Sequence, residues 1–181
     1  MKVNNHFKVA ATAIILLCVL FSVPVYSQKA PKLSDPEVAS VAVTANQIDV
    51  DFAEIAKERS KNADILQFAE TMSNDHKAVI AQAVALVTKL KVTPKDNAVS
   101  QKLQADAKKT MKMLRSKSGN AFNKAYIDNE VAYHKAVIAD VENLLIPESD
   151  NAELKALLQN VVPTLKAHLE HAIMVQTKIN K

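Results

Sequence analysis

Four stretches of the chain repeat apolar residues at alternating steps of three and four. These stripes span residues 38–55, 65–90, 127–145 and 154–179. Such steps place the apolar residues on one face of an α-helix. Gly occurs once and Trp never, while Ala, Leu, Lys, Glu and Gln are frequent, and this composition favours helices over strands. The pattern therefore predicts an all-α fold built from long amphipathic helices.

Helix-capping and helix-breaking residues separate the stripes. Ser34 is a cap followed closely by Pro36, Pro94 ends the second stripe, and Gly119 is the only glycine in the chain. Stripes and breaks together predict four long helices near residues 36–58, 61–92, 120–146 and 150–179, with a shorter helix near residues 97–117.

The shorter helix bears on the architecture. Its ~20 residues span about 30 Å at 1.5 Å per residue, which is long enough to carry the chain from one end of a bundle to the other. We therefore expect a ferritin-like four-helix bundle with a crossover helix between the second and third long helices. A plain five-helix bundle is the alternative that the sequence leaves open.

The N-terminal segment has the three parts of a secretory signal peptide. Residues 1–8 are basic, residues 9–23 are almost wholly apolar, and Ser27 is a small residue at the expected cleavage site. The apolar run is shorter than the roughly 20 residues that cross a bilayer, which argues against an uncleaved anchor. Lipid attachment at Cys18 is disfavoured, because Leu17 stands where a small residue is needed.

Cleavage after Ser27 defines the remaining organisation. We expect residues 1–27 to be the signal peptide, residues 28–35 a loose lead-in and residues 36–181 a helical bundle domain. Cleavage also removes Cys18, the only cysteine, so a hydrophobic core rather than disulfides must hold the fold. We expect an exported protein, located in the periplasm or at the outer envelope.

The charge balance of the exported part is mild. Removing Lys2 and Lys8 takes two positive charges from the formal net charge of +4 and leaves +2. The densest basic run, residues 108–117, has no aromatic residue between its lysines, and we interpret it as a solvated helix face. We expect no nucleic-acid partner and no transmembrane segment after residue 27.

Three histidines lie on the predicted core stripes, namely His76, His134 and His168. Together with Asp49 they come from four different helices. Counted at 1.5 Å per residue, they fall within roughly 8 Å of one level of the bundle. Three imidazoles and a carboxylate suit zinc, copper or iron. We therefore name Asp49, His76, His134 and His168 as candidate metal ligands.

Four further residues are candidates for accessory roles near this centre: Tyr126, Glu130, Tyr133 and His171. A carboxylate can bind a metal or orient a ligating histidine, and a tyrosine can donate a hydrogen bond to one. A structural network of histidines, tyrosines and carboxylates without metal is the alternative explanation for the core histidines. Asp75 and Glu54 are expected outside the centre, because Asp75 faces about 100° away from His76 and Glu54 points nearly opposite Asp49's stripe.

Three segments resemble a known family: residues 69–76, ending in Met-x-x-Asp-His, residues 122–127, which lead to His134, and residues 162–172, with Pro-x-Leu-x-x-His-Leu. They resemble exported bacterial proteins with a ferritin-like domain of unknown function, often labelled outer-membrane or exported proteins. The likeness covers about residues 38–178. It implies a ferritin-like bundle and no particular activity, because the activity of the family is not established.

The chain departs from that family at three positions. Asn123, Asp49 and Ala53 stand where the family usually has Asp, Glu and Gly. The Glu-x-x-His motif of di-iron ferritin-type proteins is missing, because Ser73 precedes His76 at the required spacing. Iron storage with ferroxidase chemistry is therefore not supported.

The sequence lacks several common catalytic motifs, which disfavours an enzyme but does not exclude one. There is no Gly-rich phosphate loop, no Gly-x-Ser-x-Gly elbow and no cysteine after residue 27. We expect a non-catalytic envelope or stress-related protein. A metal-binding or redox protein with a His-rich centre is the alternative.

Overall fold

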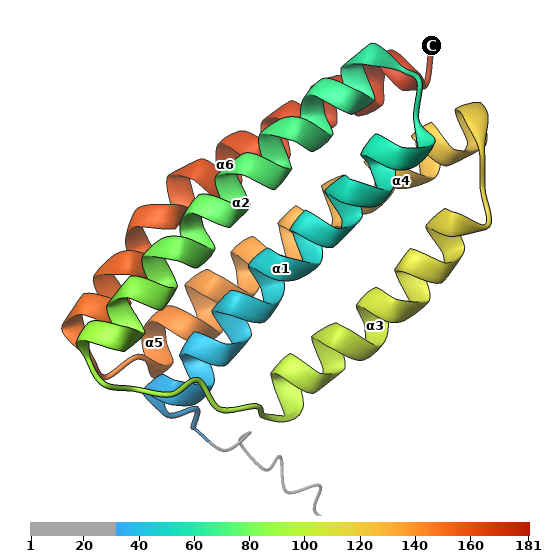
Figure 1. Cartoon of the computed structure of the whole chain (residues 1–181). Coiled ribbons are helices and arrows are strands. Elements are labelled where there is room, and N and C mark those ends of the chain that lie inside the picture. Colours follow the sequence, from blue (N-terminus) through green and yellow to red (C-terminus); the bar gives the residue numbers. More distant parts are fainter. Residues whose placement is uncertain (1–31) are drawn as a thin grey trace, which may run out of the picture. The chain divides into compact units, whose positions relative to one another are not determined.

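The four apolar stripes form the long helices of the computed structural model, which describes residues 32–181 (Figure 1). The elements are α1 (Asp35–Arg59), α2 (Ala63–Lys89), α3 (Ala98–Arg115), α4 (Gly119–Asp140), the π-helical segment η1 (Val141–Leu145), α5 (Ile146–Glu148) and α6 (Ala152–Ile179). No strand occurs among the described residues, so the predicted all-α fold is confirmed. The expected signal peptide, residues 1–27, lies outside the described residues.

Short-range sequence signals fix the ends of these helices. Ser34 and Glu37 form a capping box at the start of α1. At the starts of α2, α3 and α6, the side-chain oxygens of the N-cap residues accept hydrogen bonds from backbone N–H groups of the first helical turn. These N-cap residues are Asn62, Asn97 and Asn151. Gly119 begins α4 with a φ of 54°, a left-handed value that glycine adopts without strain. The chain therefore turns at the residue that the sequence indicated.

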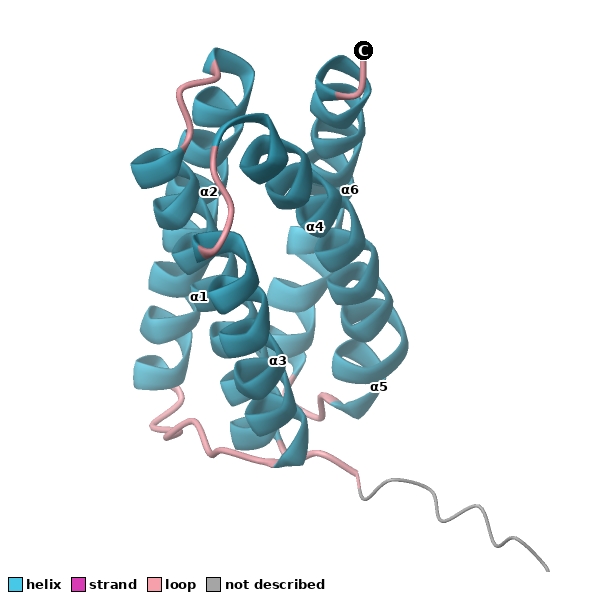
Figure 2. Cartoon of the chain, turned by 90° about the vertical axis from the view of Figure 1, so that its right-hand side faces the viewer, coloured by secondary structure: helices cyan, strands magenta, loops and turns pink. Residues whose placement is uncertain are grey.

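The four long helices pack as two antiparallel pairs. Helix α1 packs most extensively on α2, and α4 on α6, while α2 also lies beside α6 and α1 beside α4 (Figures 1 and 2). Helix α2 ends at the opposite end of the bundle from the start of α4, and α3 runs along α1 to bridge that distance. The structure therefore shows four long helices with a crossover helix rather than five equivalent helices.

The third long helix, expected near residues 120–146, is not a continuous regular α-helix in the structure. Helix α4, η1 and α5 follow one another directly, and the N–H of Ile146 donates to the carbonyl of Val141, five residues earlier. A π-helical segment inserts an extra residue into a turn, and such segments are frequent at functional sites. The apolar spacing gave no sign of this irregularity.

Two apolar clusters make up the core, one towards each end of the bundle. The aromatic cluster, near the turn between α1 and α2, includes Phe52, Phe68, Phe122 and Tyr126. The aliphatic cluster, near the other end, includes Val38, Val41, Leu145, Leu158 and Leu165. At the boundary between them lie four buried polar side chains, here called the polar layer: Asp49, His76, His134 and His168.

Of the expected lead-in, residues 28–35, the structure describes residues 32–35; Asp35 begins α1, and residues 32–34 are held in place. The Leu33 N–H donates to the Glu148 carboxylate at 3.0 Å, and the Leu33 side chain is buried in the aliphatic cluster. The Lys32 ammonium lies 2.7 Å from the Asp150 carboxylate. This stretch is therefore anchored against the connection that precedes α6.

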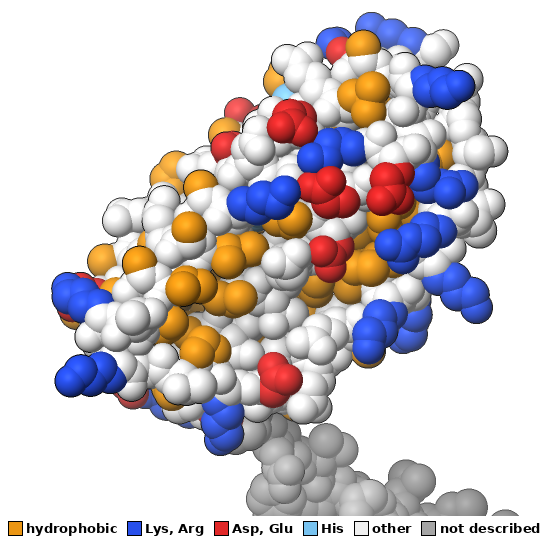
Figure 3. All heavy atoms as spheres, viewed as in Figure 1, with side chains coloured by type: hydrophobic (Ala, Val, Ile, Leu, Met, Phe, Trp, Pro, Cys, Tyr) orange, Lys and Arg blue, Asp and Glu red, His pale blue; other side chains and the backbone are white. Residues whose placement is uncertain are grey.

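Lysine and arginine side chains line the edge formed by α3 in Figure 3, and an apolar patch lies nearer the middle of the same face. Lys108, Lys109 and Lys112 on α3 are exposed, as a solvated helix face requires. Within residues 32–181, no helix has both the length and the apolar character that a membrane span needs.

Candidate metal centre

The structure brings the four candidate ligands together from four helices. Asp49 lies on α1, His76 on α2, His134 on α4 and His168 on α6. The centroids of the three imidazole rings are 5.7, 5.2 and 5.6 Å apart, and one nitrogen from each ring lies within 4.8 Å of the others. The exposed fraction of each of the four residues is 5 % or less. The polar layer is therefore a buried cluster of groups that can bind a metal.

Each of the three imidazoles uses one ring nitrogen, here called the outer nitrogen, to contact an oxygen atom outside the polar layer. The contacts are His76 Nδ1 to the Asn46 amide oxygen at 2.7 Å, His134 Nδ1 to the Glu130 carbonyl oxygen at 3.0 Å, and His168 Nε2 to the Asp75 carboxylate at 2.9 Å. All three partner atoms are oxygens, so the outer nitrogen carries the hydrogen and donates it. Metal-binding histidines commonly donate their second N–H to a carboxylate or carbonyl oxygen in this way.

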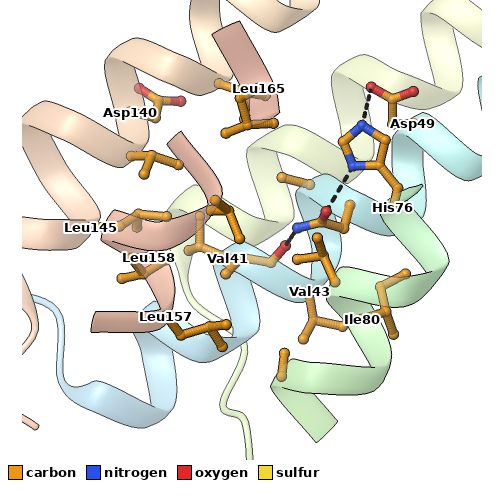
Figure 4. A pocket seen from close by; sticks show the side chains of 18 of the residues that line it. Val41, Val43, Asp49, His76, Ile80, Asp140, Leu145, Leu157, Leu158 and Leu165 are labelled. Atoms are coloured by element: carbon orange, nitrogen blue, oxygen red, sulfur yellow. Dashed lines mark hydrogen bonds and ion pairs between the residues drawn. The ribbon is translucent and has the colours of Figure 1, made fainter. Parts of the chain in front are cut away.

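Asn46 fixes the tautomer of His76. Its amide N–H donates to the carbonyl oxygen of Ala42 at 2.8 Å, one helical turn earlier, which leaves the amide oxygen facing His76 (Figure 4). His76 therefore donates from Nδ1. Its Nε2, which then carries a lone pair, faces Asp49, and the dashed line between His76 and Asp49 in Figure 4 marks this contact.

The inner atoms of the polar layer have no hydrogen-bond partner among the described protein groups. They are His76 Nε2, His134 Nε2, His168 Nδ1 and both carboxylate oxygens of Asp49. Buried polar atoms normally have partners, since each one left without costs about 1–3 kcal/mol. The three nitrogen lone pairs, and the Asp49 carboxyl once it has lost its proton, form a set of acceptors, and a cation satisfies such a set.

Distances around Asp49 fit two ligands of one ion better than hydrogen bonds. Its Oδ2 lies 3.4 Å from His76 Nε2 and 3.5 Å from His134 Nε2. An N–H···O bond is shorter, about 2.7–3.2 Å. Two ligands bound tetrahedrally at 2.0–2.1 Å to one ion lie roughly 3.4 Å apart. Asp49, His76 and His134 therefore have the spacing of ligands that share one ion, and His168 belongs to the same cluster of imidazoles.

Burial favours the uncharged forms of Asp49, His76 and His134 in the metal-free protein. It raises the pKa of Asp49 to about 8 and, together with the nearby His134 and His168 rings, lowers the pKa of His76 to about 3. Burial also lowers the pKa of His134 to about 4, against the opposing effect of its bond to the Glu130 carbonyl. At neutral pH the Asp49–histidine contacts are therefore not ion pairs. Neutral imidazole is the form that binds metals.

Glu130 adds a second buried carboxyl group beside the polar layer. Neither of its oxygens has a protein partner, and Oε2 lies 3.7 Å from His134 Nδ1. Burial and the nearby Asp49 raise the Glu130 pKa well above its usual range. Asp49, Glu130 and His134 form a second candidate ligand set. Both ligand sets contain His134, whose Nδ1 already donates to the Glu130 carbonyl oxygen. Only its Nε2 is left to bind a metal, so the two sets cannot hold separate ions through His134, and we treat them as one centre.

The other accessory candidates give no hydrogen bond to the inner nitrogens, although the Tyr133 ring packs edge-on against His134 with 6.4 Å between ring centroids. The Tyr133 hydroxyl donates to the carbonyl oxygen of Ala45 at 2.9 Å. The buried Tyr126 hydroxyl has no protein partner. The His171 ring packs edge-on against Phe68, with 5.1 Å between ring centroids. Neither tyrosine satisfies an inner nitrogen, so direct histidine–tyrosine bonds do not explain the core histidines.

Sequence reasoning missed two residues that hold the histidines, Asn46 and Asp75. Asp75 was expected outside the centre, and its side chain is 46 % exposed, but its carboxylate also holds His168 Nε2 at 2.9 Å. Helix α2 lies between α1 and α6, so side chains about 100° apart on α2 face different neighbours, and Asp75 reaches His168 on α6. Asn46 had a usable signal, because it lies three residues before Asp49 and shares its side of α1.

The family model for a domain of unknown function, DUF4142, matches residues 22–175. The chain belongs to the DUF4142 family. The DUF4142 match includes every residue of the candidate centre and confirms the resemblance to a family of unknown function. A bacterial origin, export and a ferritin-like relationship stay predictions. No curated protein and no solved structure matches the chain.

Proposed function

We propose that this DUF4142 protein binds one transition-metal ion at the centre of its bundle. The ligands are His76, His134 and His168, each through its inner nitrogen, and the Asp49 carboxylate. The main support is that the inner atoms of the polar layer have no hydrogen-bond partner. In addition, Asp49 Oδ2 lies 3.4 Å from His76 Nε2 and 3.5 Å from His134 Nε2. Zinc, copper and iron are the metals that accept three imidazoles and a carboxylate.

The chemistry of the site supports holding an ion more than catalysing a reaction with it. Four protein ligands complete a tetrahedron, whereas catalytic zinc sites use three and keep one position open. An ion of charge +2 balances the two carboxylates Asp49 and Glu130, so a loaded centre can be neutral although buried. The sequence led us to expect a non-catalytic envelope protein, with a metal-binding protein as the alternative. A non-catalytic protein that binds a metal agrees with both.

We also propose that the protein works outside the cytoplasm, in the envelope. The support is the signal-peptide pattern of residues 1–27 and the absence of cysteine from residues 28–181. Protein recovered from the envelope fraction should begin at Gln28, which N-terminal sequencing measures. Recovery of a chain that still begins at Met1 would contradict cleavage.

The test of metal binding is elemental analysis of the purified protein, followed by thermal unfolding of the metal-free form with added zinc, copper(II) or iron(II). An ion that binds only the native state stabilises it by about 2.7 kcal/mol at a hundredfold excess over its Kd. His168→Ala should abolish this shift. His171→Ala should keep it, and it is a matched control because it makes the same change three residues away on α6.

Two results would overturn the proposal: no shift with any of the three metals, or equal loss in both variants. A structural polar network makes a different prediction. Each core His→Ala change then lowers the stability of the metal-free protein by about 1–3 kcal/mol, and added metal has no effect.

A further inference from the structure

A cavity of about 50 Å³ lies between α1, α2, α4 and α6, in the half of the bundle that holds the aliphatic cluster. All four residues of the polar layer line one end of it. The rest of the wall is largely aliphatic, with Val41, Ile80, Leu145, Leu158 and Leu165 among the residues in Figure 4. Native cores leave few voids larger than a water molecule, so this cavity needs an explanation.

The size of the cavity limits what can occupy it. One water needs at least about 10–15 Å³, and an apolar cavity that binds benzene measures about 150 Å³. A volume of about 50 Å³ is therefore too small for an aromatic ring and suits a molecule of two or three heavy atoms. Its aliphatic wall disfavours ions and strongly hydrated molecules, because they would lose their hydrogen bonds to water.

The walls contain two features that suit access from outside. Thr164 on α6 lines the cavity and is exposed, so the cavity approaches solvent there. The π-helical segment η1 contributes Val141 and Leu145, and Asp140 directly before it lies across the cavity from His76 in Figure 4. An irregular turn at the wall is a place where a helix can adjust to a guest.

We propose that the cavity binds a small uncharged apolar molecule of the size of dioxygen and holds it beside the polar layer. That the guest lies next to a metal ion rests on the function proposed above. Binding to the cavity itself does not need the ion, since the aliphatic wall is present in either state. The two proposals can therefore fail separately.

Dioxygen serves as its own probe, because it is paramagnetic and speeds the relaxation of nearby nuclei. Methyl NMR spectra of the metal-free and zinc-treated protein are compared under argon and under dioxygen pressure. The methyl groups of Val41, Leu145 and Leu158, which line the cavity and are buried, should relax several-fold faster under dioxygen. Those of Ile65 and Ile127, equally buried in the aromatic cluster, should change much less.

A matched pair of variants controls this measurement. Ala83→Leu fills the cavity from its α2 wall and should remove the effect, while Ala85→Leu places the same side chain on the exposed face of α2 and should keep it. Equal relaxation of cavity and aromatic-cluster methyls in the wild-type protein would overturn the proposal. Binding of benzene at the same methyls would overturn its size limit. A dioxygen effect without metal binding would leave the cavity as proposed and reject the metal centre.

Discussion

Two carboxylates on α1, five residues apart, have opposite surroundings. Glu54, on the outer side, accepts a hydrogen bond from the Ser73 hydroxyl at 2.9 Å and lies 3.0 Å from the ammonium groups of both Lys57 and Lys77. These partners lower the pKa of Glu54 to about 2. Asp49, on the inner side, has no such donor, and burial raises its pKa to about 8.

The contrast between Glu54 and Asp49 distinguishes a residue that stabilises the fold from a residue of the proposed metal centre. Glu54 links α1 to α2 and stabilises the bundle through charge pairs at its surface. Asp49 costs stability in the metal-free protein, because both of its oxygens are buried without a partner. An apolar residue would pack there at a lower free energy. We therefore attribute Asp49 to binding and Glu54 to the fold, and each can be tested alone.

The largest expected effect is on metal affinity in Asp49→Asn. The amide keeps the size of the side chain and removes its negative charge, so the Kd for the bound metal should rise roughly a hundredfold or more. Metal-free protein at neutral pH should lose little stability, because Asp49 is already uncharged there. Competition against a chelator measures the first quantity and thermal unfolding the second. An unchanged Kd would remove Asp49 from the ligand set.

Asp75→Asn should have the next largest effect. Loss of the carboxylate that orients a ligating histidine typically costs 10–100-fold in metal affinity. Asp64→Asn is the control, since it removes another carboxylate of α2 that pairs with α6, through Lys178. The same competition titration applies to both variants. If the two weaken binding equally, Asp75 has no special role in positioning His168.

Glu54→Gln should change stability and leave metal binding intact. Removing the pairs with Lys57 and Lys77 should cost about 0.5–1 kcal/mol, the range expected for partly exposed ion pairs. Urea unfolding of the metal-free protein measures this loss. A change in Kd as large as that of Asp49→Asn would show that the two carboxylates do not have separate roles.

The smallest expected effect is the pH dependence of that stabilisation. The folded pKa of Glu54, about 2, lies below the ordinary glutamate value of about 4.3. The folded state therefore binds fewer protons than the unfolded state between these values. The contribution of Glu54 is fully present above pH ~4.3 and is lost as the pH falls towards 2. Unfolding curves of wild type and Glu54→Gln should converge between pH 5 and pH 2, and a constant gap would contradict this origin.

The helices, and the clustering of the side chains of the polar layer, could be predicted from the sequence because both depend on regular helical geometry. Apolar steps of three and four mark one face of each helix, and a fixed rise of 1.5 Å per residue gives the height of each histidine. Counting alone puts Asp49, His76, His134 and His168 within roughly 8 Å of one level. In the structure the three histidines cluster, and Asp49 lies 3.4 and 3.5 Å from His76 and His134.

The remaining parts of the site depend on how each helix is rotated against its neighbours. Asp75 was missed because one stripe per helix was counted, although α2 contacts both α1 and α6. The π-helical turn at Val141–Leu145 was missed because an inserted residue leaves the apolar pattern readable on both sides. The bond from His134 to the Glu130 carbonyl involves the main chain, which the side-chain pattern does not show.

The pairing of the helices gives the proposed metal ion a consequence for folding. Each antiparallel pair supplies two candidate ligands, Asp49 and His76 from α1 and α2, His134 and His168 from α4 and α6. An ion bound by all four is a reversible cross-link that closes the long loop between residues 76 and 134. A covalent link across such a loop removes roughly 4 kcal/mol of chain entropy from the unfolded state. In a cysteine-free chain from residue 28 onwards, the ion would take the place of a disulfide.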